Sequence, residues 1–243
     1  MSELVSGAEM DYVTPLEERE LKKIPENRFM NEQAGVPIEL CIWDIGQVIL
    51  EFSYSFLFDL ARKYSSRPDL ILQRISTFDY HTYMRGDCDF TQFCMDFCEN
   101  FEIRYREILE SEILCALRKG VLGEIEITRR AVRTFVHQGI SNAILSNALS
   151  ILADEPLSYG HLFPENQRFY SFDMNCLKPE ELAWQIVLDR TGVDPENVLF
   201  VDDQAKNVQA AIGMGIASIL FSPKTFREEL RYQLPNTFDH SKY

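Results

Sequence analysis

Five side chains that could carry out chemistry are spread over 160 positions of the chain. In order they are an aspartate, a serine, a lysine and an adjacent pair of aspartates: Asp44, Ser146, Lys178, Asp202 and Asp203. Asp44, Ser146 and the Asp202-Asp203 pair each stand at the end of an apolar run. A carboxylate can attack phosphorus and so divide hydrolysis into two easier steps, and oxygen ligands in pairs suit Mg²⁺. This order of groups predicts phosphoryl transfer through an aspartyl-phosphate.

The aspartates divide into a nucleophile and a metal-binding pair. We predict that Asp44 attacks phosphorus and also binds Mg²⁺, although a single aspartate after a strand is often only a loop cap. Asp202 and Asp203 are neighbours, and their like charges cost free energy unless a cation is present. The alternative is that the pair caps a helix that begins at Ala205. Asn207, one helical turn later, is predicted to orient Asp203.

Two further sites could hold the phosphoryl group. Ser146 and Asn147 end an apolar run, and their hydroxyl and backbone N–H groups could bind phosphoryl oxygens. Lys178 precedes Pro179, where we predict that a helix starts, and its ammonium could neutralise the charge shared by Asp44 and the phosphate. Taken alone, Ser-Asn is ordinary turn chemistry and a lone lysine is usually solvated.

The elements that must position these side chains alternate between strands and helices. Apolar runs predict strands over 37–43, 140–145, 167–172, 198–201 and 217–221, and helices are predicted over 125–137, 179–190 and 205–214. Such alternation indicates a parallel sheet with helices on both faces, a Rossmann-like three-layer α/β fold. Ligands of such sheets bind beyond the carboxyl ends of the strands, where the candidate residues fall.

The chain divides into three parts by pattern. Residues 1–36 are polar and charged and form an N-terminal extension, which is either loosely docked or a lid or dimer contact. Residues 54–121 carry apolar stripes of helical spacing and no clear strand, so we predict a small helical cap inserted after the first core strand. Residues 37–53 and 122–243 form the core.

Composition limits the remaining function classes. The 243 residues have 46% apolar content and a net charge of −14, so the chain can bury a core and should repel nucleic acid. The six cysteines form no CxxC pair, which predicts reduced thiols in a cytoplasmic protein. We expect no leader, no membrane span and a soluble protein, with monomer and homodimer both left open.

With these motifs in view, the chain resembles the haloacid dehalogenase (HAD) superfamily of phosphatases over residues 38 to 225. The residues that match its four motifs in order are Asp44, Ser146, Lys178 and Asp202-Asp203. The resemblance implies a Mg²⁺ cofactor, a helical C1-type cap and a phosphoric monoester hydrolase. Gly46 would bind Mg²⁺ through its backbone carbonyl, and we assign Ile45, Gly46 and Arg85 to substrate binding.

Within the superfamily, the chain is most similar to bacterial α-D-glucose-1-phosphate phosphatases and to the N-terminal phosphatase domain of soluble epoxide hydrolases. The similarity lies in residues 44–48, DIGQV, and in residues 83–86, YMRG, of the insert. It implies a small phosphorylated metabolite as substrate, such as a hexose 1-phosphate.

One residue departs from the superfamily pattern. Most of these phosphatases carry a second aspartate two residues after the nucleophile, which protonates the leaving oxygen, and here that residue is Gly46. General acid help is worth about 10²–10⁴-fold, although the glucose-1-phosphatase-like group also has glycine there. Gln47 and His81 are candidate substitutes for the missing acid. Substrates with good leaving groups, such as sugar 1-phosphates, would best tolerate the gap.

The main function hypothesis is therefore a Mg²⁺-dependent phosphatase acting through Asp44. The first alternative is a catalytically weak or silent phosphate-binding or regulatory protein, because Gly46 lacks the acid. A dehalogenase is a further alternative, but its attack on carbon needs no metal, and the acidic pair argues against it. A phosphomutase relies heavily on the missing acid and is less favoured still.

Overall fold

The computed structural model describes residues 37–153 and 157–233, which all lie within one compact unit. The predicted N-terminal extension, residues 1–36, lies outside the described residues. Within the described residues, no helix combines the length and the apolar character that crossing a membrane requires. All six cysteines are described, and each is a free thiol.

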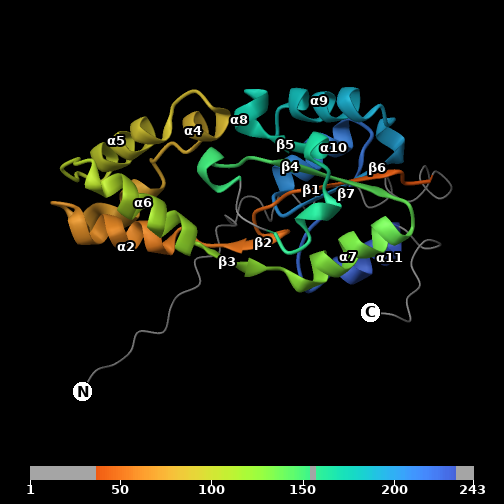
Figure 1. Ribbon diagram of the computed structural model, residues 1–243, viewed down its shortest axis with the longest axis horizontal. Helices are drawn as coiled ribbons and strands as arrows, with labels where there is room; N and C mark the ends of the chain where they lie inside the picture. Colours follow the sequence, from red (N-terminus) through yellow and green to blue (C-terminus); the bar gives the residue numbers. More distant parts are fainter. Residues whose placement is uncertain (1–36, 154–156, 234–243) are drawn as a thin grey trace, which may run out of the picture. The chain divides into compact units, whose positions relative to one another are not determined.

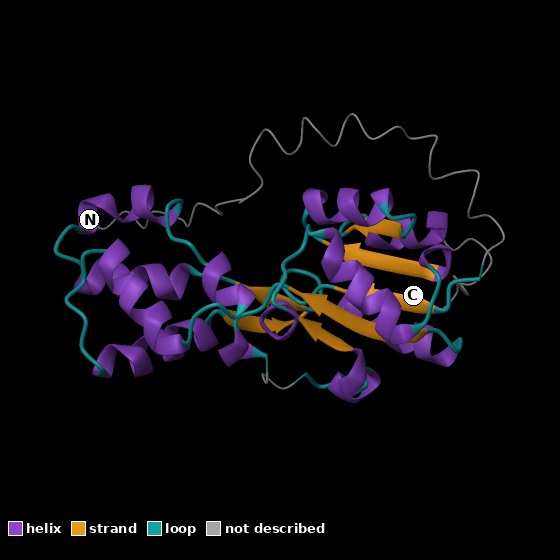
Figure 2. Ribbon diagram, turned by 90° about the horizontal axis from the view of Figure 1, so that it is seen from above, coloured by secondary structure: helices purple, strands orange, loops and turns teal. Residues whose placement is uncertain are grey.

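The core is a five-stranded parallel sheet, as the alternating pattern predicts (Figures 1 and 2). Its strand order is β5-β4-β1-β6-β7. The strands are β1 (Leu40–Trp43), β4 (Ser141–Ser146), β5 (Arg168–Tyr170), β6 (Val198–Asp202) and β7 (Ala217–Leu220). β1 pairs in parallel with both β4 and β6, so its carboxyl end lies between theirs.

Helices cover both faces of this sheet, and the alternation of side chains along β1 explains how. Cys41 and Trp43 pack in one cluster with residues of α7 (Glu126–His137) and α11 (Phe226–Gln233). Leu40 and Ile42 point the other way, into a cluster with α9 (Glu181–Thr191) and α10 (Ala205–Gly213). A strand buried on both faces needs a continuous apolar run, which is why these strands were visible in the sequence.

Five α-helices and one 3₁₀-helix lie between β1 and α7. They are α2 (Ser55–Tyr64), η2 (Pro68–Leu70), α3 (Ile71–Ile75), α4 (His81–Arg85), α5 (Phe90–Asn100) and α6 (Ile108–Lys119). Their apolar stripes pack on one another around a separate cluster that contains Phe93 and Phe97. The predicted stripe after Asp89 is α5, and the Asp89 carboxylate caps it by accepting the Gln92 N–H at 2.8 Å. Sequence patterning thus located this helical segment, whereas its role as a cap stays a prediction.

Two short strands join the helical segment to the core, and neither was predicted from the sequence. They are β2 (Leu50–Phe52) and β3 (Val121–Glu124), which pair antiparallel. Each has only three or four residues and an irregular register, so neither shows a period-two pattern. The predicted boundary at 53/54 falls just after β2, and the predicted boundary at 121/122 falls within β3.

Two predicted elements differ from the observed ones. The strand predicted over 167–172 ends at Tyr170, and α8 (Ser171–Met174) follows it. The buried Ser171 hydroxyl contacts groups outside the sheet, so the chain turns there. The helix predicted from Pro179 begins at Glu181 instead. The other 3₁₀-helices are η3 (Ser150–Leu152), η4 (Gly160–Leu162), η5 (Glu165–Gln167) and η6 (Pro195–Asn197).

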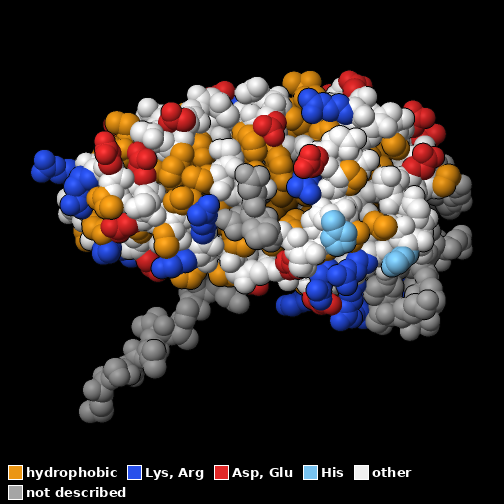
Figure 3. Space-filling model, viewed as in Figure 1, with side chains coloured by type: hydrophobic (Ala, Val, Ile, Leu, Met, Phe, Trp, Pro, Cys, Tyr) orange, Lys and Arg blue, Asp and Glu red, His pale blue; other side chains and the backbone are white. Residues whose placement is uncertain are grey.

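Charge is distributed unevenly over the surface despite the net −14 of the chain. On the face shown in Figure 3, lysine and arginine side chains gather over α7, whose sequence contains Arg129, Arg130 and Arg133. Arg129 and Arg130 both pair with Glu126 on the same helix. The exclusion of nucleic acid rested on the average charge and stays a prediction.

Candidate functional site

The predicted site residues meet at the carboxyl edge of the sheet. Asp44 follows β1, Ser146 ends β4, and Asp202 ends β6, with Asp203 next in the chain. Because β4, β1 and β6 are neighbours and parallel, their carboxyl ends lie side by side. Carboxylate oxygens of the three aspartates all lie within 4.8 Å of one another. Residues separated by more than 150 positions thus form one acidic cluster.

Lys178 is inserted between two of these carboxylates. Its Nζ donates to Asp44 Oδ1 at 2.7 Å and to Asp202 Oδ2 at 2.6 Å, and its side chain is 1% exposed. The ammonium also lies 5.5 Å from the centre of the Phe200 ring. The solvated-lysine alternative is therefore wrong, and Lys178 is a buried cation paired with two carboxylates.

Asp202 is surrounded by protein donors on both oxygens. Oδ1 accepts the Gln204 N–H at 2.8 Å and Oδ2 accepts Lys178, while the Asn207 amide lies 3.0 Å from each oxygen. The expectation that Asn207 orients Asp203 is therefore wrong, because the carboxylate it binds is that of Asp202. Three donor groups, one of them shared between both oxygens, leave Asp202 little capacity for a metal ion. Its geometry suits it to hold Lys178 in place.

Burial and the neighbouring charges both shift the pKa values of the groups in this cluster. Burial raises the pKa of Asp44, and the nearby Asp202 charge adds to this, against the opposing effects of Lys178 and of the Ser146 hydrogen bond. For Lys178, burial alone would lower the pKa, but the Asp202 and Asp44 charges outweigh it and the pKa is raised. The lysine is thus held as a cation.

Asp203 is the aspartate of the cluster that lies outside the two Lys178 pairs. It is only partly exposed, and burial together with the charges of Asp44 and Asp202 raises its pKa to about 8. With all three carboxylates ionised, the single ammonium would leave the cluster with a charge of −2. The spacing of the oxygens and this excess charge both fit a divalent cation with oxygen ligands. The residues present therefore fit Mg²⁺.

The raised pKa predicts an unusual pH dependence of stability. In protein freed of metal by a chelator, folded Asp203 keeps its proton up to about pH 8, whereas an unfolded aspartate loses it near 3.9. The folded state binds more protons between these values, so the free energy of unfolding should fall as pH rises through this window. Asp203→Asn should flatten the slope and stabilise the protein at pH 8–9 by on the order of 2 kcal/mol. Urea denaturation across pH 5 to 9 measures both effects.

The matched control for this measurement is Asp173→Asn, which removes an exposed carboxyl outside the cluster. We expect the control to keep the wild-type slope. Parallel pH profiles for wild type and Asp203→Asn would show that the Asp203 carboxyl is not perturbed.

The loop after the nucleophile is tightly closed by its own backbone. The Ile45 carbonyl accepts N–H groups from Val48, Ile49 and Leu50, and the Ile45 side chain packs on the core. Among the described residues, the hydrogen bonds that close this loop leave out the Gly46 carbonyl. Gln47 has φ +58° and its side-chain amide donates to the Phe52 carbonyl at 2.7 Å. Gln47 is thus engaged in loop structure, which weakens it as a substitute acid.

Ser146 and Asn147 play different parts. The Ser146 side chain is buried, and it lies close enough to the Asp44 carboxylate to lower the pKa of that carboxyl. The Asn147 side chain instead binds the Lys178 backbone twice, donating to its carbonyl and accepting its N–H, both at 2.9 Å. Asn147 was predicted to bind substrate, and the structure shows its side chain fixing the lysine loop.

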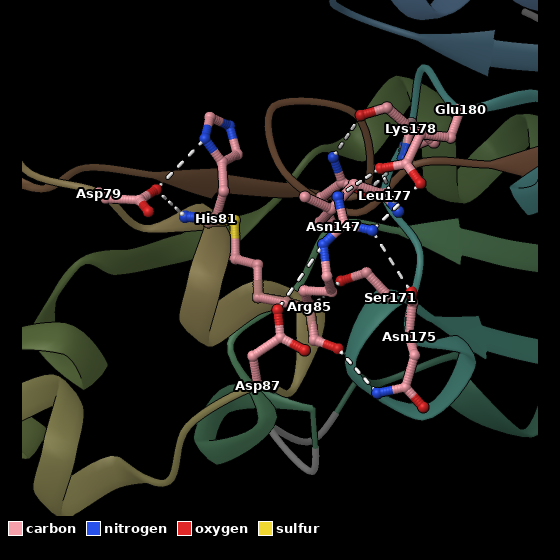
Figure 4. A network of polar contacts seen from close by, with 11 residues as sticks. Asp79, His81, Arg85, Asp87, Asn147, Ser171, Asn175, Leu177, Lys178 and Glu180 are labelled. Carbon is pink, nitrogen blue, oxygen red and sulfur yellow. Dashed lines mark hydrogen bonds and ion pairs between the residues drawn. The ribbon is translucent and has the colours of Figure 1, made fainter.

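The residues predicted on the helical insert are already engaged by protein partners. The Arg85 guanidinium binds the Glu180 carboxylate, whereas Tyr83 is buried. His81 is exposed and lies beside Asp79, with Nδ1 3.5 Å from the carboxylate (Figure 4). Sequence reasoning missed Glu180 and Ser171 altogether. A glutamate at a helix start and a serine at a strand end are too common to signal a site.

Comparison with known proteins supports this fold assignment. No protein-family model matches the chain. A HAD family enzyme from Bacteroides thetaiotaomicron, solved with magnesium and inorganic phosphate, superposes with a TM-score of 0.64 at 17% identity. That alignment covers 76% of this chain and 95% of the enzyme.

Two other structures are similar in the same way. A predicted HAD-like family hydrolase from Porphyromonas gingivalis has a TM-score of 0.61 at 15% identity and covers 80% of this chain and 98% of its own. The L-2-haloacid dehalogenase from Xanthobacter autotrophicus, with chloropropionic acid covalently bound, has a TM-score of 0.55 at 15% identity, covering 84% and 90%. The chain therefore has the α/β fold of HAD-family enzymes, a fold shared by hydrolases of more than one chemistry.

Proposed function

We propose that this protein is a HAD-type hydrolase, a Mg²⁺-dependent phosphatase that acts on a small phosphorylated metabolite through an aspartyl-phosphate on Asp44. The observation that carries the proposal is the buried Asp44–Lys178–Asp202 arrangement with Asp203 beside it. Its parts match the expected phosphoryl-transfer machinery in type and order. The similar fold of an enzyme solved with magnesium and phosphate supports this chemistry.

The metal would be held by Asp44 and Asp203, with the Gly46 carbonyl as a third ligand from the chain. Asp202 belongs to the same cluster, but its filled oxygens suit the positioning of Lys178. When bound, Mg²⁺ would offset the negative charge of the cluster and of the phosphoryl group. The acidic cluster also distinguishes this proposal from a dehalogenase, whose attack on carbon has no need of it.

The protein groups around Asp44 have distinct roles in this proposal. One Asp44 oxygen attacks phosphorus, and the ester oxygen leaves with the electron pair of its bond to phosphorus. Lys178, held as a cation, offsets the charge that the phosphate brings, and the Ser146 hydroxyl contacts phosphoryl oxygens. Gly46 supplies no acid, so leaving groups that need little protonation should react best. We therefore propose hexose 1-phosphates or similar activated monoesters as the substrate class.

The helical segment from α2 to α6 would act as a cap over the site and exclude water, as lids do in other enzymes. Its separate apolar cluster supports the idea of a second structural unit. A cytoplasmic location is consistent with the six free thiols and is proposed on that basis.

A phosphate-release screen tests the proposal. Purified protein is assayed on hexose 1-phosphates, hexose 6-phosphates, p-nitrophenyl phosphate and 2-haloacids, each with Mg²⁺ and with chelator. We expect Mg²⁺-dependent phosphate release that is fastest for the 1-phosphates. Faster turnover of 6-phosphates contradicts the substrate class, metal-independent halide release indicates a dehalogenase, and inactivity throughout favours the silent binding protein.

Restoring the absent acid should increase activity on poor leaving groups. A Cβ built on Gly46 meets only Asp44 Oδ2, at 3.9 Å, which is ordinary contact, so a side chain fits there. Gly46→Asp should raise kcat for hexose 6-phosphates by about 10²-fold, the lower part of the range for general acid catalysis. Steady-state phosphate release measures this change.

Gly46→Asn is the control, because asparagine has nearly the same size as aspartate but no acidic proton to transfer. We expect no gain from it. An equal gain in both variants would attribute the effect to packing, and no gain in either would mean that another group already protonates the leaving oxygen.

A further inference from the structure

The helical insert contacts the chain segment that carries Lys178, and α4 makes that contact against α8 (Figure 4). Gly86 follows α4 as its C-terminal cap and has a φ of +85°. A Cβ on Gly86 would lie 2.6 Å from the Phe172 carbonyl oxygen, so the two backbones touch and only glycine fits. The end of α4 is therefore placed directly on the segment that leads to Lys178.

Arg85 fixes this contact with a two-point ion pair. Its two terminal nitrogens donate to the two Glu180 oxygens, at 3.1 and 2.5 Å. The Asn175 amide donates to the Arg85 carbonyl at 3.3 Å, which adds a bond from the other side of the lysine. Two parallel hydrogen bonds between a guanidinium and a carboxylate fix the relative orientation of the two groups as well as the distance between them. Arg85 therefore binds the lysine segment both before and after Lys178.

Ser171 provides a second connection from α4 to the site. Its hydroxyl donates to the Met84 carbonyl at 2.6 Å and accepts the Ala148 N–H at 3.1 Å. Ala148 follows Asn147, whose side chain holds the Lys178 backbone at two points. Both routes thus start at the end of α4 and reach the same lysine.

We propose that Arg85 is a positioning residue that acts through Glu180 to hold the Lys178 segment in register with Asp44. This inference deepens the proposed function and rests on it for its kinetic consequence. The Lys178 ammonium has to meet Asp44 Oδ1 and Asp202 Oδ2 together, at 2.7 and 2.6 Å, so a small displacement of its segment breaks one contact. The Arg85 guanidinium is directed at Glu180. In this proposal, substrate binding by Arg85 is therefore secondary to its positioning role.

Kinetics of Arg85→Ala and Glu180→Ala distinguish positioning from substrate binding. We expect each variant to lower kcat for hexose 1-phosphate and for p-nitrophenyl phosphate by about tenfold, with little change in KM. The double variant should be no worse than either single one, because both remove one contact. The exchanged pair Arg85→Glu with Glu180→Arg should regain part of kcat, and Arg85→Lys should fall between wild type and alanine.

Arg62→Ala is the matched control, since Arg62 also pairs with an acid, Asp59, on the insert but away from this contact. It should leave kcat unchanged. A raised KM in Arg85→Ala with an unchanged kcat, and a silent Glu180→Ala, would make Arg85 a substrate ligand and overturn the proposal. A loss of thermal stability with kcat unchanged would reduce the pair to a structural role and overturn it as well.

Hydrogen–deuterium exchange separates failure of this inference from failure of the proposed function. In full-length protein, Arg85→Ala and Glu180→Ala should speed amide exchange over residues 171–180, whereas Arg62→Ala should not. Faster exchange supports the positioning role even if the wild type releases no phosphate, in which case only the proposed function fails. Exchange identical to that of wild type in both variants would overturn the positioning role.

Discussion

Asp44→Asn should lower kcat for phosphate release by about 10³-fold or more, while the protein keeps its fold. Asparagine has the size of aspartate, and its amide oxygen can still accept the bond from Lys178 Nζ that Asp44 Oδ1 accepts at 2.7 Å. A neutral amide cannot attack phosphorus effectively, so the covalent step is lost. The measurement is steady-state turnover of p-nitrophenyl phosphate with Mg²⁺, accompanied by rapid-quench trapping of phosphoprotein.

The outcome for the phosphoenzyme makes this prediction specific. Wild-type protein should incorporate phosphate at Asp44, and it should release it slowly because Gly46 offers no base to activate water. Asp44→Asn should incorporate none. Retention of a tenth or more of the activity would identify a different nucleophile. Asp173→Asn, an exposed substitution, serves as the control and should behave as wild type.

Lys178→Met should produce the largest loss of stability among the substitutions considered. The change leaves Asp44 and Asp202, both buried, without their shared cation. Removing one partner of a buried ion pair costs about 3–5 kcal/mol, because the remaining charge is uncompensated. Activity should be lost as well, since the ammonium that helps to offset the charge of the phosphate is gone. Urea denaturation of chelator-treated protein at pH 8 measures the stability change.

A second substitution shows whether the uncompensated charge is the cause. Lys178→Met combined with Asp202→Asn removes the cation and one carboxylate together, so it should recover part of the lost stability without recovering activity. The neutral asparagine can still accept from Gln204, which donates to Asp202 Oδ1 at 2.8 Å. A Lys178→Met protein as stable as wild type would mean that the pair contributes nothing to folding.

The main elements of the core were predictable because burial on both faces requires continuous apolar runs. All five core strands match predicted runs, and three of the helices between them begin or end within two residues of expectation. The strand ends then placed Asp44, Ser146 and Asp202 on one edge by topology alone, since parallel strands share their carboxyl ends.

Local pattern failed where a structure depends on partners distant in the chain. β2 and β3 are short and stabilise each other, so neither has a signal of its own. α8 replaces the end of a predicted strand because Ser171 bonds to Met84, 87 positions away. Asn207 lies where helical spacing puts it, but the choice of Asp202 over Asp203 as its partner depends on the direction of each side chain at the strand end.

By itself, the sequence determined which chemical groups stand at the ends of the core strands, because residue type and apolar periodicity are local properties of the chain. Only the tertiary structure decided which groups bond to one another. It placed Lys178 between Asp44 and Asp202, and it directed Arg85 to Glu180, 95 positions away. Such pairings need donor and acceptor atoms placed to within a few tenths of an ångström, and that precision exists only once packing has fixed the backbone.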